Sequence, residues 1–192
     1  MLLLFAPPGS AKSTYVSILL PSWYLAGHPT HSILAATHSV EFAERWGRRV
    51  RNDIAGESNI LGISLSEDSK AAARWSLASG GESVGAGVGI SGFRANLGVA
   101  DDLFGSREDA YSETVRKKRW EWYVDDFSAR LKPGAQRILM NTRWHEEDVA
   151  GRVLEQIERR ACGGPGLASS SLISFAKTLQ NGGGVGGLHS RL

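Results

Sequence analysis

A lysine followed by two hydroxyl residues ends a short loop behind an apolar N-terminal run. The run Leu2–Phe5 leads into Ala-Pro-Pro-Gly-Ser-Ala-Lys-Ser-Thr over residues 6–14. Backbone N–H groups of a small-residue loop, together with a helix N-terminus, can hold an anion. In such a loop Lys12 would reach nucleotide phosphates and the Ser13 hydroxyl would bind Mg²⁺. The candidate phosphate-binding residues are Pro8, Gly9, Ser10, Ala11, Lys12, Ser13 and Thr14.

The loop departs from the strict phosphate-loop pattern G-x-x-x-x-G-K-[ST] at both glycines. Ala6 and Ala11 stand at those two positions, and Gly9 is the one glycine between them. The alternative interpretation is a Gly/Pro-rich turn that connects a strand to a helix. The loop alone does not separate the two interpretations, so other residues must do so.

Two carboxylates follow a second apolar run. Leu97–Ala100 is expected to be a strand, and it ends at Asp101 and Asp102. In nucleoside-triphosphatases the first carboxylate at such a place holds Mg²⁺ and the second polarises the attacking water. The alternative is that the two aspartates begin a turn.

A third polar group follows the run Arg137–Met140, another expected strand. Asn141 and Thr142 stand at its end, where a side chain could sense the γ-phosphate. His145 and the three acidic residues after it resemble a metal cluster. Without a second histidine at helical spacing, they are better explained as a helix start with acidic first-turn residues.

The elements that would position these groups alternate between strand and helix. Strands are expected at 2–5, 32–37, 74–78, 97–100 and 137–140, and helices at 13–20, 39–54, 107–130 and 146–160. Pro21 should kink or end the first helix, and Gly27 should stop any continuation. This alternation predicts an α/β fold with a mostly parallel sheet flanked by helices. Because ligands bind at the carboxyl ends of parallel strands, Lys12, Asp101 and Asn141 should meet at one edge.

Apolar spacing predicts the buried faces of two of these helices. The stripe of the second helix is Phe42, Trp46, Val50 and Ile54, and that of the third is Trp120, Val124, Phe127 and Leu131. Ser39 is expected to cap the second helix, whose arginines form a solvated face. The basic run 116–119 stands beside aromatics, which are expected to pack against the sheet rather than to stack on bases.

Composition limits the class of protein. The chain has 192 residues, of which 42% are hydrophobic and 22% charged, as in a soluble globular domain. Its net charge of +2 is too small to indicate nucleic-acid binding by itself. One cysteine, Cys162, excludes an internal disulfide, and no apolar run is long enough for a membrane span. We expect residues 1–160 to form one domain and the Gly/Ser-rich residues 161–192 to form a flexible tail.

Four runs together resemble the ATPase domain of the large terminase subunit, the DNA-packaging motor of tailed bacteriophages and prophages. They are the loop at 6–14, Ser-Gly-Phe-Arg-Ala-Asn-Leu-Gly-Val-Ala-Asp-Asp at 91–102, Ser-Glu-Thr-Val-Arg at 112–116 and Asn-Thr-Arg-Trp-His-Glu-Glu-Asp-Val-Ala-Gly-Arg at 141–152. The last two runs are the more specific, since phosphate loops occur in thousands of proteins. The resemblance covers roughly residues 2–158 and implies a three-layer P-loop NTPase-like fold.

The resemblance also implies roles and partners. Lys12 and Asp102 would be catalytic, Ser13 and Asp101 would bind the metal, and Asn141 and Thr142 would couple hydrolysis to DNA movement. ATP and Mg²⁺ are the implied cofactors. Double-stranded DNA, the portal protein and the small terminase subunit are the implied partners of a ring-forming homo-oligomer in the bacterial host cytoplasm, with no membrane involved. The family's arginine finger has no clear position, and Arg94 and Arg143 are the two candidates.

The chain also differs from that family. Large terminases carry a segment ahead of the phosphate loop and an RNase-H-like nuclease domain after the ATPase domain. Here a tail without acidic residues stands in the place of the nuclease, so a truncated motor without nuclease activity is expected. A shifted reading frame in a decayed prophage gene would explain that tail. Two alternatives stay open, a non-catalytic nucleotide-binding remnant and another DNA-dependent P-loop ATPase.

Overall fold

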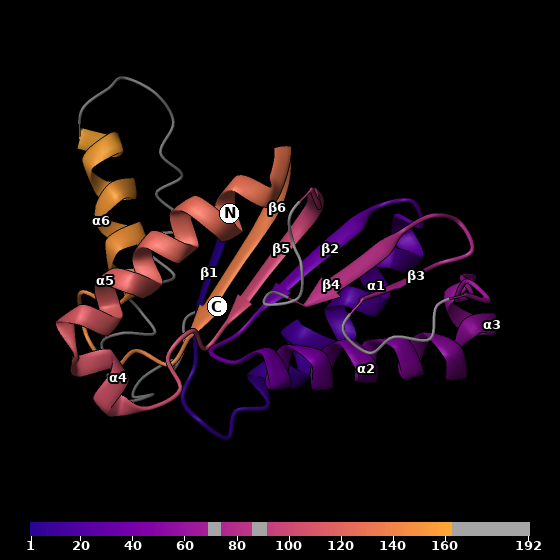
Figure 1. Ribbon diagram of the computed structural model, residues 1–192, viewed down its shortest axis with the longest axis horizontal. Coiled ribbons are helices and arrows are strands. Elements are labelled where there is room, and N and C mark those ends of the chain that lie inside the picture. The colour runs from indigo at the N-terminus through magenta and orange to yellow at the C-terminus, as the bar shows by residue number, and fades with distance from the viewer. Residues whose placement is uncertain (69–73, 86–91, 163–192) are drawn as a thin grey trace, which may run out of the picture.

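The part of the chain that the structure describes is built around a six-stranded sheet (Figure 1). The computed structural model describes residues 1–68, 74–85 and 92–162. The strands are β1 (Leu2–Phe5), β2 (Ser32–Ala36), β3 (Arg74–Ser76), β4 (Glu82–Gly85), β5 (Ala95–Asp101) and β6 (Leu131–Asn141). Their order across the sheet is β1-β6-β5-β2-β4-β3. All neighbouring pairs are parallel except β3 with β4, so the predicted mostly parallel sheet is confirmed.

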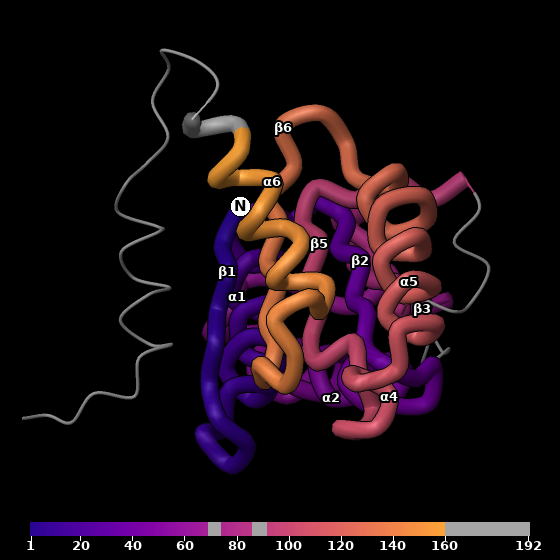
Figure 2. Tube along the Cα trace, turned by 90° about the vertical axis from the view of Figure 1, so that its left-hand side faces the viewer, coloured from indigo at the N-terminus to yellow at the C-terminus, as the bar shows by residue number. Residues whose placement is uncertain are grey.

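Helices cover both faces of the sheet, which gives three layers (Figures 1 and 2). One face carries η1 (Thr14–Leu19), α1 (Leu20–Gly27), α2 (Val40–Gly56) and α3 (Ser58–Leu61). The other carries α4 (Arg107–Tyr111), α5 (Glu113–Glu121), η2 (Trp122–Phe127), η3 (Ser128–Arg130) and α6 (Val149–Cys162). A hydrophobic core lies in each interlayer space. Leu25, Val50 and Ile54 pack in the first core, and Phe127, Val149 and Val153 pack in the second.

The first helix passes through Pro21 instead of ending there. The turn before the proline is a π-helix, in which the Leu20 N–H donates to the Tyr15 carbonyl five residues earlier. Proline has no N–H to donate and its ring clashes with a preceding carbonyl in a regular α-helix. The wider π turn places Pro21 in the first turn of α1, where a proline is tolerated. The helix then ends at Gly27, as expected.

The expected single helix over 107–130 is interrupted at Ser112. That residue is extended, and its hydroxyl accepts from the Val115 N–H at 3.5 Å, so it ends α4 and caps α5. Further along, the π turn η2 rotates the buried face. Tyr123 is buried where Val124 was expected, and Val124 is exposed, while Phe127 and Leu131 are buried as predicted.

Two other helices differ in detail from the pattern. In α2 Val50 and Ile54 are buried, but near its beginning Ala43 packs under Gly85 and Phe42 is exposed. A small residue suits that close approach to the sheet. The last helix begins at Val149 instead of Glu146, because Asp148 caps it by accepting from the Gly151 N–H at 2.8 Å. The predicted capping of α2 by Ser39 is confirmed, with its hydroxyl 3.3 Å from the Phe42 N.

Strand β6 is longer than expected and contains an irregularity. Leu131 pairs with Ala95, and Gln136 pairs with Leu97. These two pairs are five residues apart along β6 but only two residues apart along β5. Lys132, Pro133 and Gly134, expected to separate helix from strand, form part of this bulge, with Gly134 at a φ of +78°. Beyond Gln136 the pairing with β5 is regular up to Met140.

The tail expected at 161–192 lies almost entirely outside the described residues. Within the described part of the chain, no helix is both long and apolar enough to cross a membrane.

Candidate functional site

The loop after β1 has a backbone that usually requires glycine. Gly9 has a φ of +81°, and Ala11 has a φ of +56° although it carries a side chain. Ala11 occupies the second glycine position of the phosphate-loop pattern, so the loop keeps a left-handed residue there without a glycine. The Ser10 hydroxyl and N–H both bond back to the Pro7 carbonyl, at 2.8 Å and 3.4 Å. Lys12 and Ser13 begin the helix, where N–H groups have no preceding helical carbonyl to bond.

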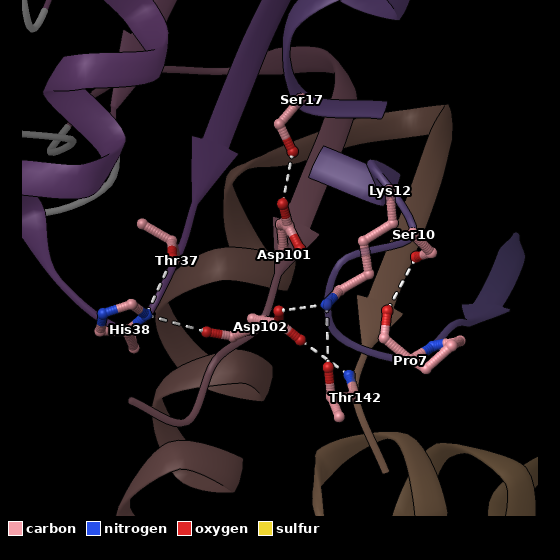
Figure 3. Close-up of polar contacts among 9 residues, drawn as sticks. All are labelled: Pro7, Ser10, Lys12, Ser17, Thr37, His38, Asp101, Asp102 and Thr142. Atoms are coloured by element: carbon pink, nitrogen blue, oxygen red, sulfur yellow. Dashed lines mark hydrogen bonds and ion pairs between the residues drawn. The ribbon is translucent and has the colours of Figure 1, made fainter. Parts of the chain in front are cut away.

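Lys12 extends from this loop toward β5 and β6 (Figure 3). Its Nζ lies 2.8 Å from Asp102 Oδ2 and donates to Thr142 Oγ1 at 2.9 Å. The lysine side chain is only 9% exposed, so these two partners hold its charge in a largely desolvated place. The three residues come from three separate segments, and the order β1-β6-β5 brings them together.

Asp102 follows β5 in a strained conformation. Its φ is +42°, which a residue with a side chain seldom adopts. Its N–H donates to the Met140 carbonyl at 2.9 Å, and its Oδ1 accepts from the Thr142 N–H at 2.7 Å. The left-handed backbone turns the Asp102 carboxylate toward Lys12, away from the neighbouring Asp101 carboxylate (Figure 3).

Asp101 points under the first turn of the helix that follows the loop. It is fully buried, and its Oδ2 accepts from the Ser17 hydroxyl at 2.7 Å. Burial raises the pKa of Asp101 to about 6, although the Ser13 and Ser17 hydroxyls and Lys12 oppose the rise. Asp101 Oδ1 is buried and has no hydrogen-bond partner among the described residues. This buried carboxylate oxygen can therefore still accept a hydrogen bond or bind a cation.

Asn141 is the last residue of β6, which lies in the sheet between β1 and β5. Its side chain is 2% exposed, and neither atom of its amide has a hydrogen-bond partner among the described residues. Buried amides are nearly always satisfied, so both atoms are available to a water molecule, an ion or a ligand at the site.

A cavity of about 190 Å³ opens beside these residues. Its polar wall is formed by Lys12, His38, Asp102, Asn141 and Thr142, and its apolar wall by Pro8, Phe104, Gly105 and Trp144. Of the predicted phosphate-binding residues, only Pro8 and Lys12 line it. Sequence reasoning missed Ser17, His38, Phe104 and Trp144. Ser17 could have been found, since it lies one helical turn after Ser13. His38 comes two residues after the end of β2, the strand beside β5.

The residues present fit a magnesium ion by their chemistry. Mg²⁺ prefers oxygen ligands, and the unpartnered Asp101 Oδ1 and the neighbouring Ser13 hydroxyl are both oxygens. Within the described residues no group of three or more His, Cys, Asp or Glu side chains could hold a metal. A hydrated ion bound by one carboxylate, one hydroxyl and substrate phosphates needs no such group.

The two arginine-finger candidates occupy different places. Arg143 turns inward, with its Nε 3.1 Å from the buried Asp148 and its guanidinium over the Phe5 ring. Arg94 precedes β5 and therefore lies at the opposite end of the sheet from Lys12. Neither guanidinium reaches the cavity within one chain.

His145 Nδ1 accepts from the Glu147 N–H at 3.0 Å, in the turn that leads to α6.

Comparisons with known proteins agree with this architecture. The family model for the T4-like type of terminase large subunit, N-terminal part, matches residues 3–179. The crystal structure of the bacteriophage HK97 large terminase is similar, with a TM-score of 0.51 and 12% sequence identity. The alignment covers 83% of this chain and 33% of that one, so the chain spans about a third of the HK97 protein's length. No curated protein sequence matches the chain. Because that family model matches residues 3–179, the chain belongs to the family of the N-terminal part of T4-like terminase large subunits.

Proposed function

We propose that this chain performs the Mg-dependent ATP hydrolysis of a viral or prophage DNA-packaging motor. The observation that carries the proposal is the contact of Lys12 Nζ with both Asp102 and Thr142 beside the first N–H groups of a helix. Two further features support it: the left-handed Ala11 and the buried, unpartnered Asp101 Oδ1. Nuclease activity is not part of the proposal.

Phosphate binding would rearrange the lysine contacts. The loop N–H groups and Lys12 Nζ would hold the β- and γ-phosphates, as anions are held at helix N-termini. Lys12 would then turn from Asp102 toward the phosphates, because these carry more negative charge than one carboxylate and compete for the three N–H donors of its ammonium group. The change would free Asp102 Oδ2, while Oδ1 keeps its bond from the Thr142 N–H and holds the carboxylate at the cavity.

The freed carboxylate would orient the attacking water. Asp102 would accept a proton or a hydrogen bond from that water, in line with the γ-phosphate. Asp101 and Ser13 would hold Mg²⁺, which when bound neutralises charge on the phosphate oxygens. Lys12 would stabilise the charge that develops on the transferred group. Pro8, Phe104 and Trp144 would keep other water out of the cavity.

Asn141 and Thr142 would report the state of the phosphate to the rest of the chain. Thr142 bonds to both Lys12 and Asp102, so it loses or gains a partner when the lysine moves. The segment after it is anchored through Arg143 to Asp148 at the beginning of α6. In the complete motor this coupling would act on double-stranded DNA, in a ring at the portal with the small terminase subunit, in the host cytoplasm.

The test is phosphate release from Mg-ATP by the purified full chain. Lys12→Ala and Asp102→Asn should abolish turnover, whereas Lys118→Ala, an exposed lysine on α5, should leave it unchanged. Nucleotide binding is measured in parallel by calorimetry. Wild-type binding without turnover would favour the second candidate, a non-catalytic nucleotide-binding remnant. Absence of binding would refute both candidates.

A further inference from the structure

His38, which no pattern in the sequence singled out, lies against Asp102 at the cavity. It follows β2, the neighbour of β5 in the sheet. The His38 N–H donates to the Asp102 carbonyl at 3.2 Å, and the His38 ring Nδ1 lies 3.3 Å from the same oxygen (Figure 3). Two groups of one residue therefore converge on the carbonyl of the strained aspartate.

The Asp102 contact requires one form of the His38 ring. A carbonyl oxygen can only accept a hydrogen bond, so the contact is favourable only when Nδ1 carries a proton. Thr37 Oγ1 lies 3.2 Å from the same Nδ1 and can share that proton as an acceptor. In the other neutral form, the Nδ1 lone pair would face the carbonyl oxygen and repel it.

The ring has little freedom to leave this position. An added Cβ at Gly105 would lie 3.0 Å from His38 Cδ2, so the ring packs closely on that glycine. The Phe42 ring lies across from it, with the two centroids 4.8 Å apart. The His38 carbonyl in turn accepts from Arg119 of α5 at 3.0 Å. His38 is thus fixed from both faces of the sheet.

We propose that His38 is a positioning residue that keeps Asp102 in its left-handed conformation, with the carboxylate turned toward the cavity. The proposal rests on the function proposed above, in which Asp102 orients the attacking water. Among the described residues, His38 makes no hydrogen bond to Lys12 or to the loop. Its loss should therefore affect the chemical step and leave nucleotide binding intact.

Two replacements separate the hydrogen bond from the bulk of the ring. Asparagine places an N–H donor close to the position of Nδ1, whereas leucine has similar size and no donor. We expect His38→Leu to lower kcat at least tenfold, with KM for ATP and the nucleotide Kd within twofold of wild type. His38→Asn should keep most of kcat. His28→Leu, an exposed histidine at the opposite end of the sheet, serves as the control.

Three results would overturn the proposal. They are an unchanged kcat in His38→Leu, an equal loss in the leucine and asparagine variants, or a parallel loss of kcat and nucleotide binding. A wild-type chain without turnover would instead refute the proposed function, and the role of His38 is then tested by stability.

The stability test compares the same two replacements in urea unfolding. His38→Leu removes the ring donor to the Asp102 carbonyl and should lower the urea midpoint, whereas His38→Asn keeps a donor there and should lie closer to wild type. Equal midpoints for the two variants would show that the ring does not hold Asp102 through this bond, whatever the activity.

Discussion

Replacing Gly151 by alanine should destabilise the chain, although alanine favours helices. Gly151 lies in the first turn of α6, and a Cβ there would overlap the Glu146 carbonyl. That carbonyl also accepts from Arg143 at 3.3 Å, and Arg143 is paired with the buried Asp148. The turn over 143–148 therefore folds back directly over the glycine, and it must move if a methyl group is added.

The expected magnitude follows from opposing contributions. Overpacking costs about 1–3 kcal/mol. Displacing the turn also weakens the Arg143–Asp148 pair, and disrupting a buried pair costs up to about 3–5 kcal/mol. The gain in helix propensity offsets about 1 kcal/mol. We expect a net loss of about 3 kcal/mol, which for a chain of this size lowers Tm by about 6–12 °C.

Thermal unfolding of the full chain followed by circular dichroism measures this change. The matched control is Gly56→Ala at the end of α2, where an added Cβ meets nothing within 4 Å. The control should keep or slightly raise Tm, by the same gain in helix propensity. If Gly151→Ala were as stable as the control, the close approach of the Glu146 carbonyl would be wrong.

Three further changes test other parts of the structure. Because burial raises the pKa of Asp101 from 3.8 to about 6, its ionisation should weaken folding as pH rises from about 4 to 6. Without divalent cations, the stability gained by Asp101→Asn over wild type should therefore be about 2 kcal/mol larger at pH 7 than at pH 4. An equal difference at both pH values would contradict this. Ala11→Gly should stabilise the loop by about 0.5 kcal/mol, as relief of a left-handed alanine slightly exceeds the entropic cost of glycine; a clear loss in urea unfolding would argue against the strain. Gly98→Ala should lower the free energy of unfolding by about 1–3 kcal/mol, because its Cβ would lie 2.9 Å from the buried Phe127 ring. An unchanged urea midpoint would show that the Phe127 ring can move aside.

The arrangement of the site at one edge could be predicted from the sequence, because it depends on a strong pattern. The apolar runs that end at Asp101 and Asn141, and the run at 2–5 that leads into the loop of Lys12, predict parallel strands with these residues beyond their carboxyl ends. The observed β5, β6 and β1 confirm this arrangement. The catalytic, metal-binding and coupling roles of these residues stay predictions.

The contacts between side chains could not be predicted in the same way. The left-handed conformation of Asp102 has no signature, since aspartate at a strand end adopts many conformations. His38 becomes part of the site only because β2 pairs with β5, a long-range fact. The π turns before Pro21 and at 122–127 could not be predicted from apolar spacing either, because that pattern assumes 3.6 residues per turn.

The bulge in β6 has a consequence for how the chain tolerates changes in length. Residues 132–135 lie between Leu131 and Gln136, which pair with β5 only two positions apart. An insertion or deletion of one residue there can be absorbed by the bulge, with the register of Met140 kept. The same change between 136 and 140 would turn the Asn141 side chain to the other face of the sheet, because side chains alternate along a strand. Related chains should therefore vary in length before Gln136 and keep a constant spacing from there to Thr142.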